Sequence, residues 1–235
     1  MKQMVKLLRY TQETISMLDK FITPVIKPLL TPAIVLLNKC GVTANQLTII
    51  GFFIGLLAVP LLAFQYWYAA LTAIVLNRFI DGLDGALARY ANESSSAGGF
   101  LDITLDFIFY ATIPFGFIFA TPEQNAIAGS FLLVAFIGTG SSFLAFAIAA
   151  EKFKLEKPQF KYKSFYYLNG LTEGTETIAF FVAFCLWPQY FSVLATVFAI
   201  ACVITIVTRI YGGYHTLKHQ EANALNTQDE KVKND

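Results

Sequence analysis

The chain has 235 residues, of which 56% are hydrophobic and only 14% are charged, with 23 phenylalanines and a mean hydropathy of +0.56. Soluble domains carry about 25% charged residues, so this composition excludes an ordinary soluble domain and predicts one polytopic, all-α membrane domain over 1–235. The net charge of +1 is uninformative about a nucleic-acid partner, and none is expected. Three scattered cysteines have neither metal-ligand spacing nor the pattern of a disulfide framework, and we interpret them as packing residues.

The first 40 residues form a predicted juxtamembrane segment. Over residues 1–22, apolar residues recur at helical spacing with charges between them, namely Met4, Leu8, Ile15, Leu18 and Ile22. No uninterrupted apolar core or small-residue cleavage site is present, so we do not interpret this segment as a signal peptide. The pattern predicts an amphipathic helix that lies on the membrane surface, with a cytosolic helix as the alternative. Three prolines then interrupt the segment.

Six apolar segments follow, and we predict that each crosses the membrane as a transmembrane helix. The predicted spans cover about 45–64, 67–89, 98–120, 126–150, 173–187 and 191–212. The connections between them are predicted turns near 65, 122 and 188 and two loops over 90–97 and 151–172. The polar tail over 216–235 is expected to be disordered.

Lysines and arginines predict how these six spans are oriented. All 17 fall on the side of the amino terminus, whereas the turns near 65, 122 and 188 carry none. The positive-inside rule therefore places both termini and the stretch 81–106 towards the cytoplasm. We find no internal repeat or inverted duplication of the kind that many transporters have.

Four carboxylates lie within the stretch 81–106, which joins the second and third predicted spans. Asp81 and Asp84 are three residues apart and Asp102 and Asp106 are four apart, so each pair shares a helix face. A carboxylate costs roughly 2.5–3.5 kcal/mol near the bilayer centre, and four together repel one another unless a cation joins them. Oxygen ligands favour Mg²⁺, Mn²⁺ or Ca²⁺ over zinc. The stretch predicts a metal site.

The two helices that carry the aspartates are expected to be antiparallel neighbours. Small residues on the same faces let the backbones approach and leave a cleft, namely Gly85, Ala88 and Gly98. Arg89 lies at the cytoplasmic mouth, where its planar guanidinium can pair with a phosphate. Carboxylates, metals and a guanidinium suit phosphoryl transfer. In the alternative interpretation these are helix-end charges paired with Arg78 and Arg89, but two arginines cannot neutralise four aspartates.

The same residues resemble a known family. They match, without a gap, the signature of the CDP-alcohol phosphatidyltransferases, D-x2-D-G-x2-A-R-x8-G-x3-D-x3-D, at Asp81, Asp84, Gly85, Ala88, Arg89, Gly98, Asp102 and Asp106. The whole chain also resembles bacterial inner-membrane members that carry the stretches GTGSSFLAFA (138–147) and GLTEGTET (170–177). The resemblance implies a multi-pass protein of the bacterial inner (cytoplasmic) membrane. It also implies a homodimer with six spans per chain and an active site open to cytoplasm and lipid.

The resemblance implies an activity and a role for each motif residue. CMP is displaced from a CDP-linked alcohol, usually the lipid CDP-diacylglycerol, by a second alcohol, with two divalent cations, Mg²⁺ or Mn²⁺. Asp81 and Asp102 would bind both metals, Asp84 the first and Asp106 the second, and Asp106 would also be the general base. The CDP portion would be held by Gly85, Arg89 and Ser95.

The acceptor alcohol is less well defined by the sequence. A phosphorylated acceptor needs cations, which Arg78, Lys163 and Arg209 would supply, although each is also explained as an interfacial or snorkelling residue. Glu173 and Glu176, at the start of the fifth span, would instead attract a cationic alcohol or bind a polyol. They would equally cap the helix or pair with arginines. We therefore expect Arg78, Glu173, Glu176 and Arg209 to line the acceptor pocket.

Two other functions fit the same carboxylates. A CDP-choline-type phosphotransferase that acts on diacylglycerol carries the same motif. A membrane cation transporter or metal-binding scaffold belongs to a different class and would need a polar path beyond the site. The distal parts of the spans, for example 107–120 and 177–187, are nearly all apolar, which favours the enzyme.

Overall fold

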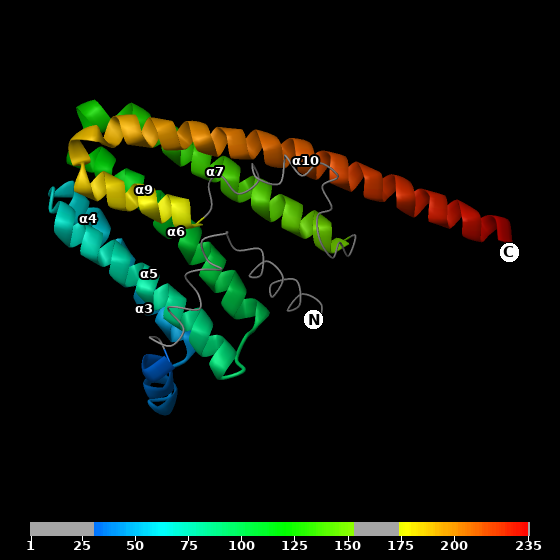
Figure 1. The fold of residues 1–235 in the computed structure, drawn as a ribbon, viewed down its shortest axis with the longest axis horizontal. Helices are drawn as coiled ribbons and strands as arrows, with labels where there is room; N and C mark the ends of the chain where they lie inside the picture. The colour runs from blue at the N-terminus through cyan, green and yellow to red at the C-terminus, as the bar shows by residue number, and fades with distance from the viewer. Residues whose placement is uncertain (1–30, 153–173, 235) are drawn as a thin grey trace.

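The computed structural model describes residues 31–152 and 174–234, and every regular element within them is helical (Figure 1). After a helix over 31–39 come α3 (Ala44–Leu56), α4 (Ala58–Ala63), α5 (Trp67–Tyr90), α6 (Ser96–Ala120), α7 (Pro122–Lys152), α9 (Gly174–Leu186), the 3₁₀ turn η1 (Pro188–Tyr190) and α10 (Phe191–Asn234). The predicted all-α class is confirmed. The predicted amphipathic helix over 1–22 lies outside the described residues.

Four stretches in the described part of the chain are both long and apolar enough to cross a membrane, namely Ala44–Ala63, Ser96–Ala120, Pro122–Lys152 and Pro188–Ala222. The other two predicted spans correspond to α5 and α9. The 24 residues of α5 include the charged residues of the motif, which lower its hydropathy, and α9 has only 13 residues. Six spans therefore remain a prediction, whereas four agree with the structure.

Three turns that carry no lysine or arginine gather at one end of the bundle (Figure 1). The Gln65 side-chain amide donates a hydrogen bond of 3.1 Å to the carbonyl of Ala120, which joins the first turn to the second. The Ser192 hydroxyl donates one of 2.5 Å to the carbonyl of Gln124, which joins the third to the second. The charge pattern predicts that successive spans run in opposite directions, with the turns near 65, 122 and 188 on one side. The gathering of these three turns at one end of the bundle agrees with that prediction.

The helix α3 lies unusually close to α5 and α6. Thr43 caps its first turn in a reciprocal capping box with Gln46. At Gly51, a Cβ would lie 2.9 Å from the Ile80 side chain, and at Gly55 it would lie 2.8 Å from the ring of Phe109. Any larger residue at these two positions would push α3 away, so the glycines set the distance at which α3 meets the carboxylate-bearing helices.

A phenylalanine-rich core fills the bundle on the distal side of the carboxylates. Its largest fully buried aromatic side chains are Phe109, Phe117, Phe181, Phe184, Phe191 and Phe198. The rings of Phe117 and Phe191 stack with centroids 4.5 Å apart. Because Phe109 follows Asp106 by three residues on α6, the apolar core begins immediately beyond the carboxylates.

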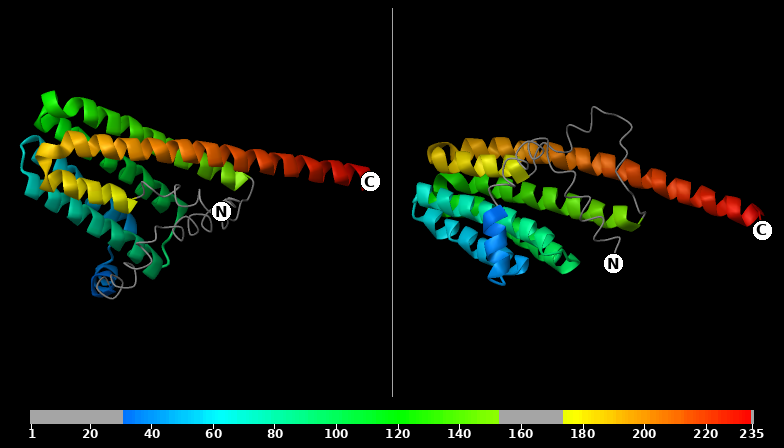
Figure 2. Two further views of the ribbon diagram at one scale, coloured as in Figure 1. Left: turned by 45° about the horizontal axis from the view of Figure 1, so that its top comes forward. Right: turned by 60° about the horizontal axis from the view of Figure 1, so that its bottom comes forward.

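The last helix corrects one prediction, because the polar tail over 216–235 was expected to be disordered. α10 instead continues to Asn234, for 44 residues, and extends past the other helices (Figures 1 and 2). After Gly213 the sequence has no glycine or proline and is rich in alanine, glutamate, glutamine and lysine. These residues have high helix propensity, so the helix continues although its residues are polar.

Candidate active site

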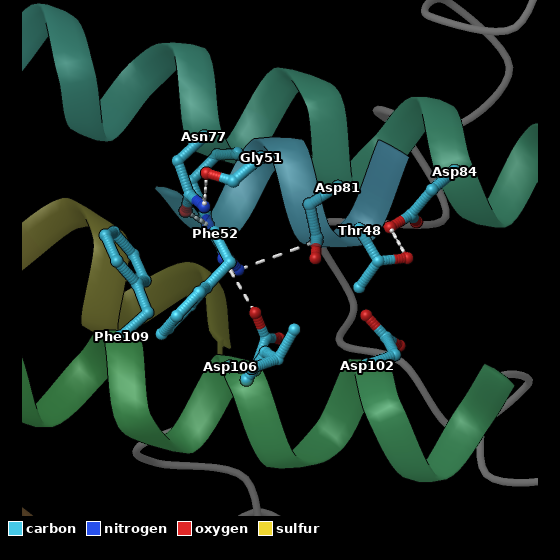
Figure 3. A pocket seen from close by; sticks show the side chains of 11 residues that line it. Thr48, Gly51, Phe52, Asn77, Asp81, Asp84, Asp102, Asp106 and Phe109 are labelled. Carbon is cyan, nitrogen blue, oxygen red and sulfur yellow. Dashed lines mark hydrogen bonds and ion pairs between the residues drawn. The ribbon is translucent and has the colours of Figure 1, made fainter. Parts of the chain in front are cut away.

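The carboxylates of the motif meet because α5 and α6 run antiparallel. Asp81 precedes the last residue of α5 by nine positions and Asp106 follows the first residue of α6 by ten. At 1.5 Å per residue, both therefore lie roughly 14–15 Å from the helix ends that the 91–95 connection joins. Figure 3 shows the side chains of the two helices turned toward one another. The pocket between them is lined by Thr48, Gly51, Phe52, Asn77, Arg78, Asp81, Asp84, Asp102, Leu105, Asp106 and Phe109.

Three of the four aspartates form a group that fits a divalent cation. Asp81, Asp102 and Asp106 each offer a carboxylate oxygen, and these oxygens lie within 4.8 Å of one another. Each of the three residues is half-buried. A set of carboxylate oxygens at this spacing suits Mg²⁺, Mn²⁺ or Ca²⁺. The predicted clustering of these aspartates agrees with the structure, while their role as ligands stays a prediction.

Asp84 lines the same pocket but lies outside this group of three. Its side chain is almost fully buried, with 4% exposure. The Thr48 hydroxyl donates a hydrogen bond of 2.5 Å to Asp84 Oδ2, from α3 to α5 (Figure 3). The same hydroxyl also lies 3.1 Å from the carbonyl of Ala44. Thr48 thus fixes the orientation of Asp84, and the sequence analysis did not identify it.

Arg78 lies inside the carboxylate cluster. Its Nη2 donates a hydrogen bond of 2.7 Å to Asp106 Oδ1, and its Nη1 lies 3.5 Å from Asp81 Oδ2. Its side chain is only 16% exposed. One guanidinium among four aspartates leaves most of the negative charge uncompensated, so room remains in the charge balance for divalent cations.

Neighbouring residues hold the Arg78 guanidinium from three directions. Its Nε donates to Asn77 Oδ1 at 2.8 Å, and its Nη1 donates to the Tyr110 hydroxyl at 3.2 Å. The guanidinium carbon lies 4.7 Å from the centroid of the Phe109 ring. Asn77 is itself fixed, because its amide donates to the carbonyl of Gly51 at 2.8 Å. The sequence signal for this arrangement is an asparagine at the end of an apolar run, and these two hydrogen-bond partners of Asn77 lie on α3 and on α5 itself.

The residues predicted to hold the CDP portion lie outside the carboxylate pocket, around the connection between α5 and α6. Arg89 is exposed, and its guanidinium lies back over Gly85, 3.4 Å from where a Cβ would be. Ser95 is the N-cap of α6, where its hydroxyl accepts a hydrogen bond from the Gly98 amide at 3.1 Å. They therefore flank the end of the pocket nearest the connection, and their role stays a prediction.

The four predicted acceptor residues do not form one pocket among the described residues. Arg78 belongs to the carboxylate pocket, whereas Arg209 donates from α10 to the carbonyl of Thr139 on α7, at 3.2 Å. Glu176 lies in the first turn of α9, and Glu173 lies outside the described residues, as does Lys163. The start of α9 is nevertheless close to the pocket, because a Cβ at Gly174 would lie 3.5 Å from the Tyr110 hydroxyl.

Comparison with known sequences identifies relatives. A sequence model of the CDP-alcohol phosphatidyltransferase family matches residues 41–209. The chain is 58% identical over 202 residues to the inner membrane protein YnjF of Escherichia coli, covering 86% of this chain and 98% of that one. It is also 48% identical over 80 residues to the archaetidylinositol phosphate synthase of Pyrococcus horikoshii, covering 34% of this chain and 43% of the relative.

Comparison with solved structures identifies the same fold. The phosphatidylinositol phosphate synthase PgsA1 of Mycobacterium tuberculosis with CDP-DAG bound superposes with a TM-score of 0.56 at 20% identity, covering 80% of this chain and 94% of that one. The same enzyme in complex with manganese and citrate gives a TM-score of 0.56 at 19% identity, covering 79% and 88%. These similarities establish the fold.

Proposed function

Because the chain belongs to the CDP-alcohol phosphatidyltransferase family, whose members are transferases, we propose that it displaces CMP from CDP-diacylglycerol by the hydroxyl of a second alcohol, in phospholipid biosynthesis. The observation that carries this proposal is the group of Asp81, Asp102 and Asp106, whose oxygens lie within 4.8 Å of one another. The PgsA1 structures, one with CDP-DAG and one with manganese, guide the choice of donor and metal.

The metal site of the proposed enzyme is built from the motif aspartates. Asp81 and Asp102 would hold two cations, Mg²⁺ or Mn²⁺, with Asp84 and Asp106 completing the two ligand sets. When bound, such cations neutralise the charge of a diphosphate and of the departing phosphate. Asp84 is suited to its part because Thr48 already orients it.

Side chains of the motif would bind the diphosphate and accept the proton of the acceptor alcohol. Arg89 would bind the diphosphate at the mouth, and Gly85, which lacks a side chain, would leave room for the nucleotide beside Arg89. Ser95 would hold the CDP portion from the start of α6. Asp106 would accept the proton of the acceptor hydroxyl as that oxygen attacks the β-phosphorus and the bond to CMP breaks.

We also propose a location and an assembly for the protein, which the family relationship supports. Several helices have the length and hydropathy of membrane spans, and the relative YnjF is named an inner membrane protein. We therefore place this chain in the bacterial inner membrane, with both termini and the active site on the cytoplasmic side, as a homodimer. Light scattering of the purified protein in detergent measures whether two chains associate.

The test is release of CMP from labelled CDP-diacylglycerol by the purified protein with a panel of alcohols. EDTA should abolish the release and Mg²⁺ or Mn²⁺ should restore it, because only divalent cations can neutralise the remaining carboxylates. Unchanged turnover in EDTA would contradict the metal-dependent mechanism. Turnover with CDP-choline and diacylglycerol, and none with CDP-diacylglycerol, would establish the phosphotransferase alternative. Metal uptake into vesicles without any CMP release would establish a transporter.

A further inference from the structure

The pocket contains a fixed cation that is not part of the family signature. Arg78 precedes Asp81 by three residues and therefore lies one helical turn farther from the mouth of the pocket. A snorkelling arginine extends toward the membrane surface. The Arg78 side chain instead extends across to α6, where it contacts Asp106 and Tyr110.

The guanidinium is held rigidly enough to orient another group. It donates to three different acceptors besides Asp81, namely Asn77 Oδ1, Tyr110 Oη and Asp106 Oδ1, at 2.8, 3.2 and 2.7 Å. It also lies 4.7 Å from the Phe109 ring and 5.3 Å from the Tyr110 ring, at distances typical of cation–π contacts. Contacts from neighbouring groups on several sides leave a planar guanidinium little rotational freedom.

We propose that Arg78 is a positioning residue, which holds the Asp106 carboxylate through Oδ1 in the orientation needed for proton transfer and shares the pocket with the divalent cations. This inference rests on the proposed function, in which Asp106 is the base. It gives Arg78 a role beside Asp106 in place of the acceptor-pocket role expected from the sequence. A base misplaced by about 1 Å can lose on the order of 100-fold in rate.

The inference predicts effects of opposite sign on binding and on turnover. Arg78 Nη2 and Nη1 contact oxygens of Asp106 and Asp81, two aspartates of the group that would hold the metal. Removing the guanidinium removes both a like charge and a competitor for these oxygens, so a divalent cation should bind more tightly. The same change releases Asp106 and should slow the chemical step. A residue that only stabilises the fold would weaken both properties together.

The experiment uses the full chain in detergent, with Arg78→Gln, Arg78→Lys and Tyr110→Phe. We expect Arg78→Gln to lower kcat at least tenfold with the KM for CDP-diacylglycerol within threefold, and to lower the Mn²⁺ dissociation constant at least threefold by isothermal titration without substrate. Arg78→Lys should recover part of kcat because the charge remains. Tyr110→Phe removes one acceptor but keeps the ring, so its effect on kcat should be smaller.

Lys39→Gln is the matched control, because it removes a cation from an exposed position outside the pocket. An Mn²⁺ affinity of Arg78→Gln equal to or weaker than that of the wild type would overturn the proposal, and so would an unchanged kcat. If the wild-type protein binds Mn²⁺ but releases no CMP with any alcohol, the proposed function fails. In that case the role of Arg78 in proton transfer fails with it, and the titration of Arg78→Gln with Mn²⁺ still tests whether the guanidinium competes with the cation: an affinity equal to or weaker than that of the wild type would overturn this part as well.

Discussion

Two aspartates in one pocket are expected to respond differently to substitution. Asp106 is proposed to take the proton, so Asp106→Asn should lower kcat by about 10²–10⁴-fold, the usual scale for a general base, with a modest loss of CDP-substrate affinity. Asp81→Ala should instead weaken binding of metal and nucleotide together, since Asp81 is proposed to hold both cations. Isothermal titration of both variants with a CDP ligand and Mn²⁺ measures the difference. Equal damage to binding in the two would mean that Asp106 acts mainly as a ligand.

Thr48 is a second residue whose effect is expected to be local. Thr48→Val keeps the shape of the side chain but removes the hydrogen bond to the buried Asp84. A hydrogen bond to a charged group contributes about 1.5–3 kcal/mol. Because only the lost orientation of Asp84 affects metal binding, Mn²⁺ affinity should fall by up to about 10-fold. Thr72→Val is the matched control on α5, because that hydroxyl donates only to the backbone of its own helix. Equal Mn²⁺ affinities in the two variants would contradict a role for Thr48 in orienting Asp84.

At the scale of the helices, the close approach of α3 should limit what the site tolerates. In Gly55→Ala the added methyl group would lie 2.8 Å from the Phe109 ring and 2.9 Å from Asn77 Cγ. Overpacking of this kind costs about 1–3 kcal/mol, and it would also displace the residue that holds Arg78. Gly82→Ala is the control, because its Cβ would meet no atom within 4 Å. Thermal unfolding in detergent should show a lower midpoint for Gly55→Ala, and equal midpoints would refute the packing argument.

The helices also show which parts of the site a sequence can predict. The spacing of Asp81, Asp102 and Asp106 along α5 and α6 is local information, because a helix has a fixed rise and the connection between the two helices is short. The parts contributed by α3 depend on tertiary contacts. Thr48 reaches Asp84 across 36 positions in the sequence, and no periodicity in either helix predicts this pairing. Arg78 was identified as a functional cation, but the direction of its side chain depends on Asn77 and on α6.

For the whole molecule, the charge pattern of the sequence and the positions of the helix ends define the same axis along the bundle. The turns without lysine or arginine lie together at one end, and the helix ends that flank the carboxylate pocket lie toward the other (Figures 1 and 2). A transporter would need polar groups along that axis. The described core beyond Asp106 is instead built from stacked phenylalanines. This favours a site open at one side of the membrane only, as a transferase acting on a lipid requires.

The cysteines allow the orientation to be measured in the nearly native chain. Cys40 is exposed near the start of α3, whereas Cys185 and Cys202 are each 1% exposed. Cys40 lies on the same side as the lysines and arginines, so a membrane-impermeant maleimide should label it in inverted inner-membrane vesicles and not in intact spheroplasts. Cys40→Ser should abolish the labelling, because thiols buried in the helical core do not react.

A second cysteine variant provides the opposite reference point. Glu123 is exposed in the first turn of α7, at the end of the bundle where the cation-free turns gather. In a Cys40→Ser background, Glu123→Cys should be labelled in spheroplasts and protected in inverted vesicles. The six-span prediction places three membrane crossings between residues 40 and 123, so the two positions should lie on opposite sides. If both were labelled from the same side, the six-span arrangement would be wrong. If the pattern were reversed, the active site would face away from the cytoplasm, where cytidine nucleotides are made and recycled, and the proposed reaction would lose its donor.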